Sequence, residues 1–129
     1  MPTNVLKIGA DIFKKLNENQ KEAILKTLTA DDYILIRGFP GTGKTQTLVA
    51  MIDLLVKLDK SVLITAHTNT AIDNILLKLL EQKIDFIRFG SVSKTHPSLR
   101  HMVDENVTAL CDSPESLHTI YSSKVNDSF

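Results

Sequence analysis

A glycine-rich loop at residues 38–45 constrains this chain more than any other part of its sequence. The loop reads Gly-Phe-Pro-Gly-Thr-Gly-Lys-Thr and fits the pattern GxxxxGK(S/T). Its glycines allow backbone N–H groups to close on phosphate oxygens, its lysine can reach the β- and γ-phosphates, and its last hydroxyl can bind Mg²⁺. A strand-like apolar run, 33–37, precedes the loop and a helical pattern follows it. This order of strand, loop and helix is the context that a phosphate-binding loop requires.

Length and composition set broad limits on the chain. Its 129 residues suit one domain or part of one, and fifteen basic residues balance fifteen acidic ones, which neither favours nor excludes a nucleic-acid partner. The single cysteine, Cys111, excludes an intrachain disulfide and a cysteine-rich metal site. The N-terminus lacks the features of a signal peptide, and no run reaches transmembrane length. We therefore expect a soluble intracellular protein.

The hydrophobic pattern predicts alternating helices and strands. Helical spacing covers residues 5–16, 17–30, 43–58 and 70–82, and strand-like runs cover 33–37, 61–66 and 86–89. The expected buried stripe of the third helix consists of Leu48, Ile52, Leu55 and Val56. Three strands separated by two helices indicate two right-handed βαβ crossovers and a parallel sheet. After Gly90 the pattern loosens, and Ser113-Pro114-Glu115 is typical of the start of a short helix.

Gln20 lies eighteen residues before the loop and has two possible roles. Its amide can accept a hydrogen bond from adenine N6 and donate one to N7. Alternatively, it closes a capping box at the start of the helix that begins at Asn17. The loop downstream makes the adenine contact the favoured interpretation.

The segment 65–74 leaves the second predicted strand and enters a helix. Ligands of open parallel sheets bind at the carboxyl ends of the strands. Short hydroxyl and amide side chains beside a helix N-terminus also suit phosphodiester oxygens. Thr68, Asn69 and Thr70 are therefore candidate nucleic-acid contacts. Thr68 or Asn69 can also serve as a helix cap, and the two roles are compatible.

Three segments together resemble the superfamily 1 helicases that move 5′ to 3′. They are LNENQKEAI at 16–24, GFPGTGKT at 38–45 and VLITAHTNTAIDNILLKL at 62–79. Within that superfamily the chain is similar to the first motor lobe of the eukaryotic DNA replication helicase/nucleases that process Okazaki-fragment flaps, over about 16–100. The RNA helicases of nonsense-mediated decay are the alternative. Phe39, His67 and Asn69 stand where the helicase/nucleases usually have Met, Tyr and His.

The resemblance implies an α/β P-loop NTPase fold, a RecA-like three-layer sandwich around a parallel sheet, of which this chain forms part of one lobe. It implies a helical segment at 1–16, an ATP-binding core at 17–100 and a helical or loose tail at 101–129. ATP and Mg²⁺ are the implied cofactors. The implied partner is single-stranded DNA, or RNA in the alternative, and the implied location is the nucleus. The family's iron–sulfur cluster belongs to a nuclease that this chain does not contain.

The resemblance also assigns individual residues. The implied nucleotide contacts are Gln20, Gly38, Pro40, Gly41, Thr42, Gly43, Lys44, Thr45 and Gln46. Lys44 is the implied catalytic residue, because its charge neutralises the γ-phosphate, and Thr45 is the implied Mg²⁺ ligand. Thr68, Asn69 and Thr70 would grip the DNA strand.

Several motifs of the family are missing from the sequence: the strand that ends in Asp-Glu, the glutamine sensor and the second lobe with its arginine fingers. Asp104-Glu105 lacks the apolar strand of that motif, so we interpret it as a solvated acidic pair. We therefore expect a fragment, a truncated gene model or a short isoform that binds ATP but hydrolyses it poorly. Two alternatives are a free-standing nucleotide-binding regulatory module and a small-molecule kinase. A kinase would need neither Gln20 nor the segment 65–74.

Overall fold

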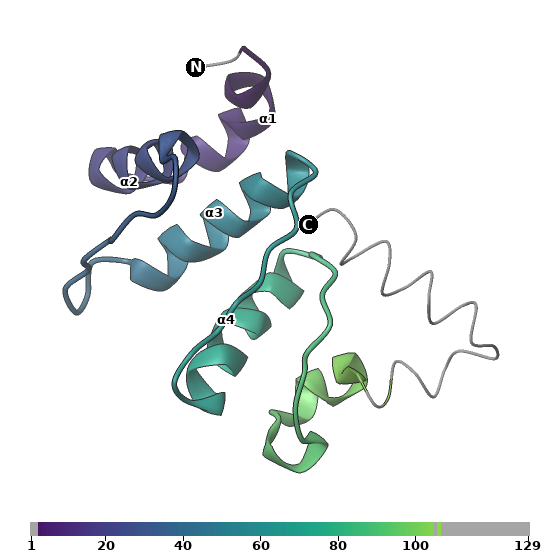
Figure 1. The fold of residues 1–129 in the computed structure, drawn as a ribbon. Coiled ribbons are helices and arrows are strands. Elements are labelled where there is room, and N and C mark those ends of the chain that lie inside the picture. Colours follow the sequence, from purple (N-terminus) through teal and green to yellow (C-terminus); the bar gives the residue numbers. More distant parts are fainter. Residues whose placement is uncertain (1–2, 105, 107–129) are drawn as a thin grey trace. The chain divides into compact units, whose positions relative to one another are not determined.

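The computed structural model describes residues 3–104 and 106, and the chain divides into two compact units, 1–59 and 60–129 (Figure 1). The boundary between the units falls inside the ATP-binding core predicted at 17–100. Both the helix predicted at Ser113 and most of the predicted tail lie outside the described residues.

The first unit contains three helices that share one apolar core. They are α1 (Thr3–Phe13), α2 (Glu18–Thr29) and α3 (Lys44–Lys57), and α3 contacts both of the others (Figure 1). The core cluster consists of Ile12, Leu16, Ile24, Met51 and Leu54. Ile24 and Leu54 are completely buried. Burying one side chain of this size stabilises the folded state by about 1.5–3 kcal/mol. This cluster is therefore the main source of stability of the unit.

The start of α2 is fixed by a capping box. The Asn17 side chain accepts a hydrogen bond from the Gln20 backbone N–H at 2.9 Å, and the Gln20 side chain accepts one from the Asn17 backbone N–H at 2.9 Å. Two N–H groups that the helix leaves without partners are thereby satisfied. The predicted helix start at Asn17 is confirmed.

The buried face of α3 differs from the predicted one. Its buried residues are Val49, Met51, Ile52 and Leu54. Of the predicted stripe only Ile52 is fully buried, and Val56 is exposed. The helix carries apolar residues on more than one side, so spacing alone could not select the core face. Contact with α1 and α2 selects it.

The second unit is built on α4 (Asn69–Glu81), which confirms the helix predicted at 70–82. Two short 3₁₀ helices follow, η1 (Val92–Lys94) and η2 (Pro97–Met102), and α4 contacts η2. Among the described residues of this unit, the buried apolar ones are Leu76, Leu79, Leu99 and Val103. The polar stretch after Gly90 is therefore ordered around a small core of its own.

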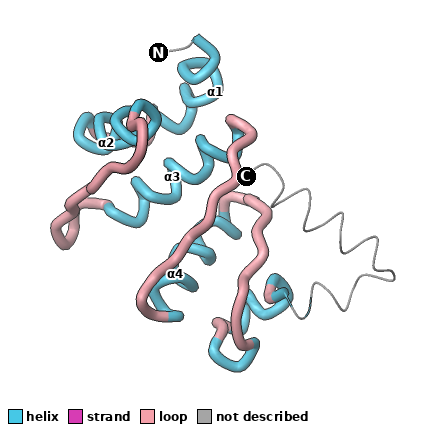
Figure 2. The backbone as a smooth tube through the Cα atoms, viewed as in Figure 1, coloured by secondary structure: helices cyan, strands magenta, loops and turns pink. Residues whose placement is uncertain are grey.

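The predicted parallel sheet does not form within the described residues. Residues 33–37 and 61–66 are loops (Figure 2), and the run 86–89 takes part only in an isolated parallel bridge between Arg88 and Val103. Leu35 and Leu63 are 89% and 82% exposed. A strand needs a hydrogen-bonded neighbour along its length. In the described part of the chain these apolar runs have no such neighbour, so the sheet remains a prediction.

Candidate nucleotide-binding site

The glycine-rich loop turns back on itself just before α3. The Thr42 backbone N–H donates to the Phe39 carbonyl at 3.3 Å, and the Thr42 hydroxyl donates to the same oxygen at 2.6 Å. Gly43 is the N-cap of α3, and no side-chain hydrogen bond caps this helix. The first N–H groups of a helix, together with the positive end of its dipole, form a natural phosphate site when no side chain occupies them.

Each of three glycines in the loop is required for a physical reason. Gly41 and Gly43 have φ angles of 77° and 78°, the left-handed region that costs other residues about 1–2 kcal/mol. A Cβ atom at Gly43 would also lie 2.7 Å from Gln20 Nε2, whereas one at Gly41 would meet nothing within 4 Å. A Cβ atom at Gly38 would overlap the aliphatic stem of Lys44. Gly38 is thus needed for close approach, Gly41 for backbone conformation and Gly43 for both.

The Lys44 side chain is exposed, and its charged end has no partner among the described residues. Its stem lies against Gly38. Among the described residues, neither the Lys44 ammonium group nor the Thr45 hydroxyl has a hydrogen-bond or ion-pair partner. A free cation beside an uncapped helix N-terminus creates a local positive potential, which is the electrostatic requirement for binding a polyphosphate.

Gln20 joins α2 to the loop. Its side chain is buried, its Oε1 atom accepts from Asn17 as part of the capping box, and its Nε2 atom donates to the Gly43 carbonyl at 3.3 Å. The capping box, which was the alternative role predicted for Gln20, is therefore present. The amide still has one more N–H and one more lone pair, and the contact with adenine stays a prediction. The tether to Gly43 was not predicted, and it connects two motifs that lie 23 residues apart.

The remaining predicted nucleotide contacts lie around this loop. Pro40, Gly41 and Thr42 are exposed. Gln46 donates from Nε2 to the Lys15 carbonyl at 3.2 Å, which links the first turn of α3 to the segment after α1. Its side chain therefore has a structural partner in addition to its predicted role.

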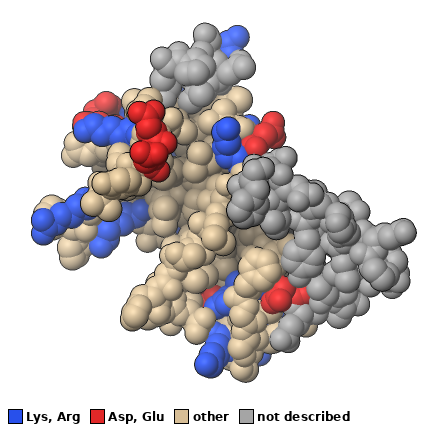
Figure 3. Space-filling model, viewed as in Figure 1, with Lys and Arg blue, Asp and Glu red and all other residues tan. Residues whose placement is uncertain are grey.

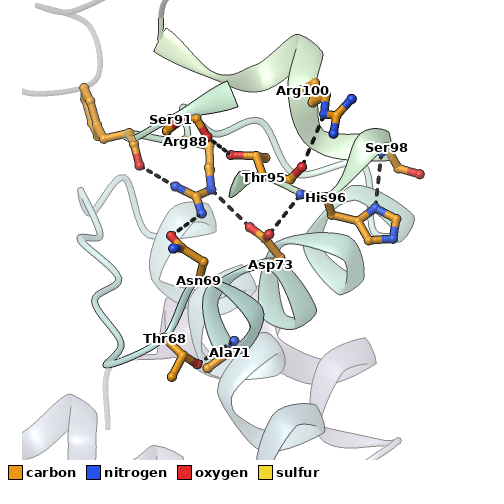
Figure 4. Close-up of polar contacts among 11 residues, drawn as sticks. Thr68, Asn69, Ala71, Asp73, Arg88, Ser91, Thr95, His96, Ser98 and Arg100 are labelled. Atoms are coloured by element: carbon orange, nitrogen blue, oxygen red, sulfur yellow. Dashed lines mark hydrogen bonds and ion pairs between the residues drawn. The ribbon is translucent and has the colours of Figure 1, made fainter. Parts of the chain in front are cut away.

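The predicted nucleic-acid contacts lie at the start of α4 in the second unit (Figure 4). The Thr68 hydroxyl accepts from the Ala71 backbone N–H at 3.2 Å and caps the helix. Asn69 is exposed, but its Oδ1 atom accepts from Arg88 Nη2 at 2.9 Å. Thr70 is exposed. The structure thus gives Thr68 the capping role and pairs Asn69 with Arg88, and the predicted contact of these residues with nucleic acid stays a prediction.

A buried ion pair beneath Asn69 was missed at the level of sequence. Arg88 and Asp73 are only 3% and 6% exposed, and Arg88 Nε donates to Asp73 Oδ1 at 3.0 Å. The other Asp73 oxygen accepts from the His96 backbone N–H at 3.0 Å. Two signals were available: an aspartate on the apolar side of a helical pattern, and an arginine inside the apolar run 86–89.

On the face drawn in Figure 3, the basic and acidic side chains of the described residues are interspersed. No three His, Cys, Asp or Glu side chains in this part of the chain are grouped to hold a metal ion. None of its helices is long and apolar enough to cross a membrane.

Comparison with known proteins agrees with the loop chemistry. A family model described as an AAA domain matches residues 15–127. The chain is 44% identical over 107 residues to the DNA replication ATP-dependent helicase/nuclease DNA2 of Gallus gallus, covering 83% of the chain and 11% of that protein. Against the Homo sapiens protein of the same name the identity is 41% over 107 residues, with 83% and 10% covered. Against that of Saccharomyces cerevisiae it is 49% over 88 residues, with 68% and 6% covered.

The chain therefore spans only a small part of these relatives, between 6% and 11% of their length. The region they share with it includes most of the sequence, and the family match includes the whole glycine-rich loop and both helices that flank it. Because that match extends over most of its length, the chain belongs to the AAA domain family, which has the P-loop NTPase fold.

Proposed function

We propose that this chain is the ATP-binding part of a DNA helicase/nuclease motor that moves along single-stranded DNA. The observation that carries the proposal is the loop at 38–45, where an uncommitted lysine lies beside an uncapped helix N-terminus. The 40–49% identity to DNA replication ATP-dependent helicase/nucleases supports this motor in preference to an RNA helicase or a regulatory module. A nuclear location follows from the replication role of those relatives.

The backbone and two side chains of the loop have defined roles in this proposal. Backbone N–H groups at the start of α3 bind the β- and γ-phosphates, and Lys44 neutralises the charge of the γ-phosphate. The Thr45 hydroxyl would ligate Mg²⁺, which would supply positive charge to neutralise the phosphates. Gln20 contacts adenine with the part of its amide that the capping box and Gly43 leave unused.

The proposal extends to the sheet and to the DNA contact. In a complete motor lobe, we propose that the exposed runs 33–37 and 61–66 become strands of a parallel sheet, as in the P-loop NTPase fold. Their exposed apolar side chains, Leu35 and Leu63 among them, would then be covered. Thr68, Asn69 and Thr70 would contact the phosphodiester backbone of single-stranded DNA.

Calorimetric titration of ATP·Mg²⁺ into the chain tests the nucleotide site. Lys44→Ala should weaken binding by about 1.5–3 kcal/mol, the range for a hydrogen bond to a charged group. Lys57→Ala is a matched control, because Lys57 is a partly exposed lysine at the opposite end of α3 that pairs with Asp53 at 3.1 Å. Equal affinities for the unmodified chain and Lys44→Ala, both folded by circular dichroism, would overturn the proposal.

A further inference from the structure

Arg88 is held in place through both its backbone and its side chain. Its backbone N–H donates to the Met102 carbonyl at 2.8 Å, and its own carbonyl accepts from the Asp104 N–H at 3.0 Å, which forms the parallel bridge. Its side chain is buried and donates to Asp73 and to the Phe89 carbonyl as well as to Asn69. The planar fork of an arginine fixes the relative directions of such bonds.

Both carboxylate oxygens of Asp73 also accept hydrogen bonds. One carboxylate oxygen accepts from Arg88 Nε and the other from the His96 backbone N–H, each at 3.0 Å (Figure 4). Asp73 belongs to α4 and Arg88 to the run 86–89, so the ion pair holds α4 against this run. Because Asp73 is buried and its charge is compensated by Arg88, it directs the guanidinium group and is not exposed to a ligand.

Asn69 is the point where this buried network reaches the surface. Arginine can only donate hydrogen bonds, so the atom of Asn69 that faces Arg88 Nη2 must be the oxygen. The Nδ2 group then faces away from Arg88, and within the described residues it has no acceptor. The exposed part of the Asn69 amide is thereby restricted to two N–H donors, which suit an anionic oxygen.

We infer that Arg88 and Asp73 are positioning residues that hold Asn69 as a hydrogen-bond donor to the phosphodiester oxygens of single-stranded DNA. This inference rests on the proposed function, and adds to it the means by which one contact is oriented. Stability alone is a weak reason for such a network, because replacing a buried ion pair with well-packed apolar residues is often neutral or stabilising. The phosphodiester backbone is the same in every DNA sequence, so a donor held in one direction can contact it without sequence preference.

Fluorescence anisotropy of a labelled oligothymidylate with the full 129-residue chain, at several salt concentrations, tests the inference. Asn69→Ala should lower affinity by about 2- to 12-fold, the equivalent of one hydrogen bond, and leave the salt slope unchanged, because a neutral amide displaces no counterion. Arg88→Lys should have a similar effect, because an ammonium group can pair with Asp73 but lacks the fork that also fixes Asn69. In the Asn69→Ala background, Arg88→Lys should cause no further loss, since it acts through Asn69.

A second pair of variants separates the effect of the Asn69 side chain's orientation from the effect of an added negative charge. Asn69→Asp keeps an oxygen for Arg88 but presents a carboxylate oxygen to the phosphate, so its affinity should fall below that of Asn69→Ala. Gln82→Glu adds the same charge at the exposed C-terminal end of α4 and is the control. It should weaken binding much less than Asn69→Asp.

The outcomes distinguish this inference from the proposed function. If Arg88→Lys weakens binding equally with and without Asn69, or if Asn69→Ala binds as the unmodified chain does, the positioning role is wrong while DNA binding stands. If the unmodified chain binds no oligothymidylate at low salt while binding ATP, the proposed DNA contact fails and this inference with it. Tighter binding to oligouridylate than to oligothymidylate would likewise overturn single-stranded DNA as the partner.

Discussion

Two glycines of the loop have nearly the same φ angle in different surroundings. Gly41 and Gly43 differ by only one degree in φ, yet a side chain at Gly41 would enter open space and one at Gly43 would meet the Gln20 amide. This pair separates the intrinsic cost of a left-handed residue from the cost of disturbing a contact.

We expect Gly41→Ala to lower the free energy of unfolding by about 1–2 kcal/mol, the left-handed cost alone. Gly43→Ala should cost more, because it also displaces Gln20 and its hydrogen bonds, worth about 0.5–1.5 kcal/mol each. Urea unfolding of both variants, alone and with Gln20→Ala, measures the difference. In the Gln20→Ala background the two alanine variants should cost the same. A persistent excess at Gly43 would show that Gln20 is not its cause.

Gln20 has a structural and a proposed base-reading role, and nucleotide competition can separate them. If it reads adenine, Gln20→Ala should weaken ATP more than GTP, because the lost donor and acceptor match only adenine. If it acts only through the Gly43 carbonyl, both nucleotides should lose affinity equally. We expect the first result, measured by calorimetry with each nucleotide. Asn17→Ala is the control, since it weakens the same cap without removing the amide.

At the scale of elements, the helices and the extended runs are stabilised differently. The helices of the first unit bury Ile24 and Leu54 completely, while the runs 33–37 and 61–66 expose large apolar side chains. A helix satisfies its own backbone hydrogen bonds, whereas a strand depends on a neighbour. In this chain the helices are therefore the stable elements.

Leu35→Ser tests this difference. Because Leu35 is almost fully exposed, the substitution should change the free energy of unfolding by no more than about 0.5 kcal/mol. Leu54→Ala, at a completely buried position of α3, should cost about 2–5 kcal/mol. Chemical denaturation measures both. A cost at Leu35 comparable to that at Leu54 would mean that the run 33–37 is already covered in a sheet in this chain.

At the scale of the whole molecule, binding and turnover should be separable. We expect the 129-residue chain to show no ATPase activity that single-stranded DNA stimulates, because the resemblance to helicases implies that turnover also needs a metal carboxylate strand and arginine fingers, and we find neither motif in these 129 residues. Loss of an arginine finger alone lowers the rate of related NTPases by about 10³-fold or more. A chain extended through the missing strand and second lobe should regain activity. Phosphate release assays check both. DNA-stimulated turnover by the short chain, lost in Lys44→Ala, would contradict this expectation.

Much of the candidate site could be predicted from the sequence because it depends on local chemistry. The motif spacing located Gly38, Gly43 and Lys44, and the structure shows a conformational or contact requirement at both of these glycines. The tether from Gln20 to Gly43 could not be predicted in this way, since it joins residues that only packing brings together. The same is true of the Arg88–Asp73 pair, whose members lie fifteen residues apart.

The sequence by itself determined the four main helices, the cap at Asn17 and the phosphate-binding loop, because capping, periodicity and glycine requirements act over a few residues. Only the tertiary structure decided which face of α3 is buried and that Asn69 faces Arg88, and within the described residues the runs 33–37 and 61–66 are loops. These features depend on contacts between distant segments. An apolar run specifies that a strand is possible, but a neighbouring strand must supply its hydrogen bonds, and the described residues contain none for 33–37 or 61–66.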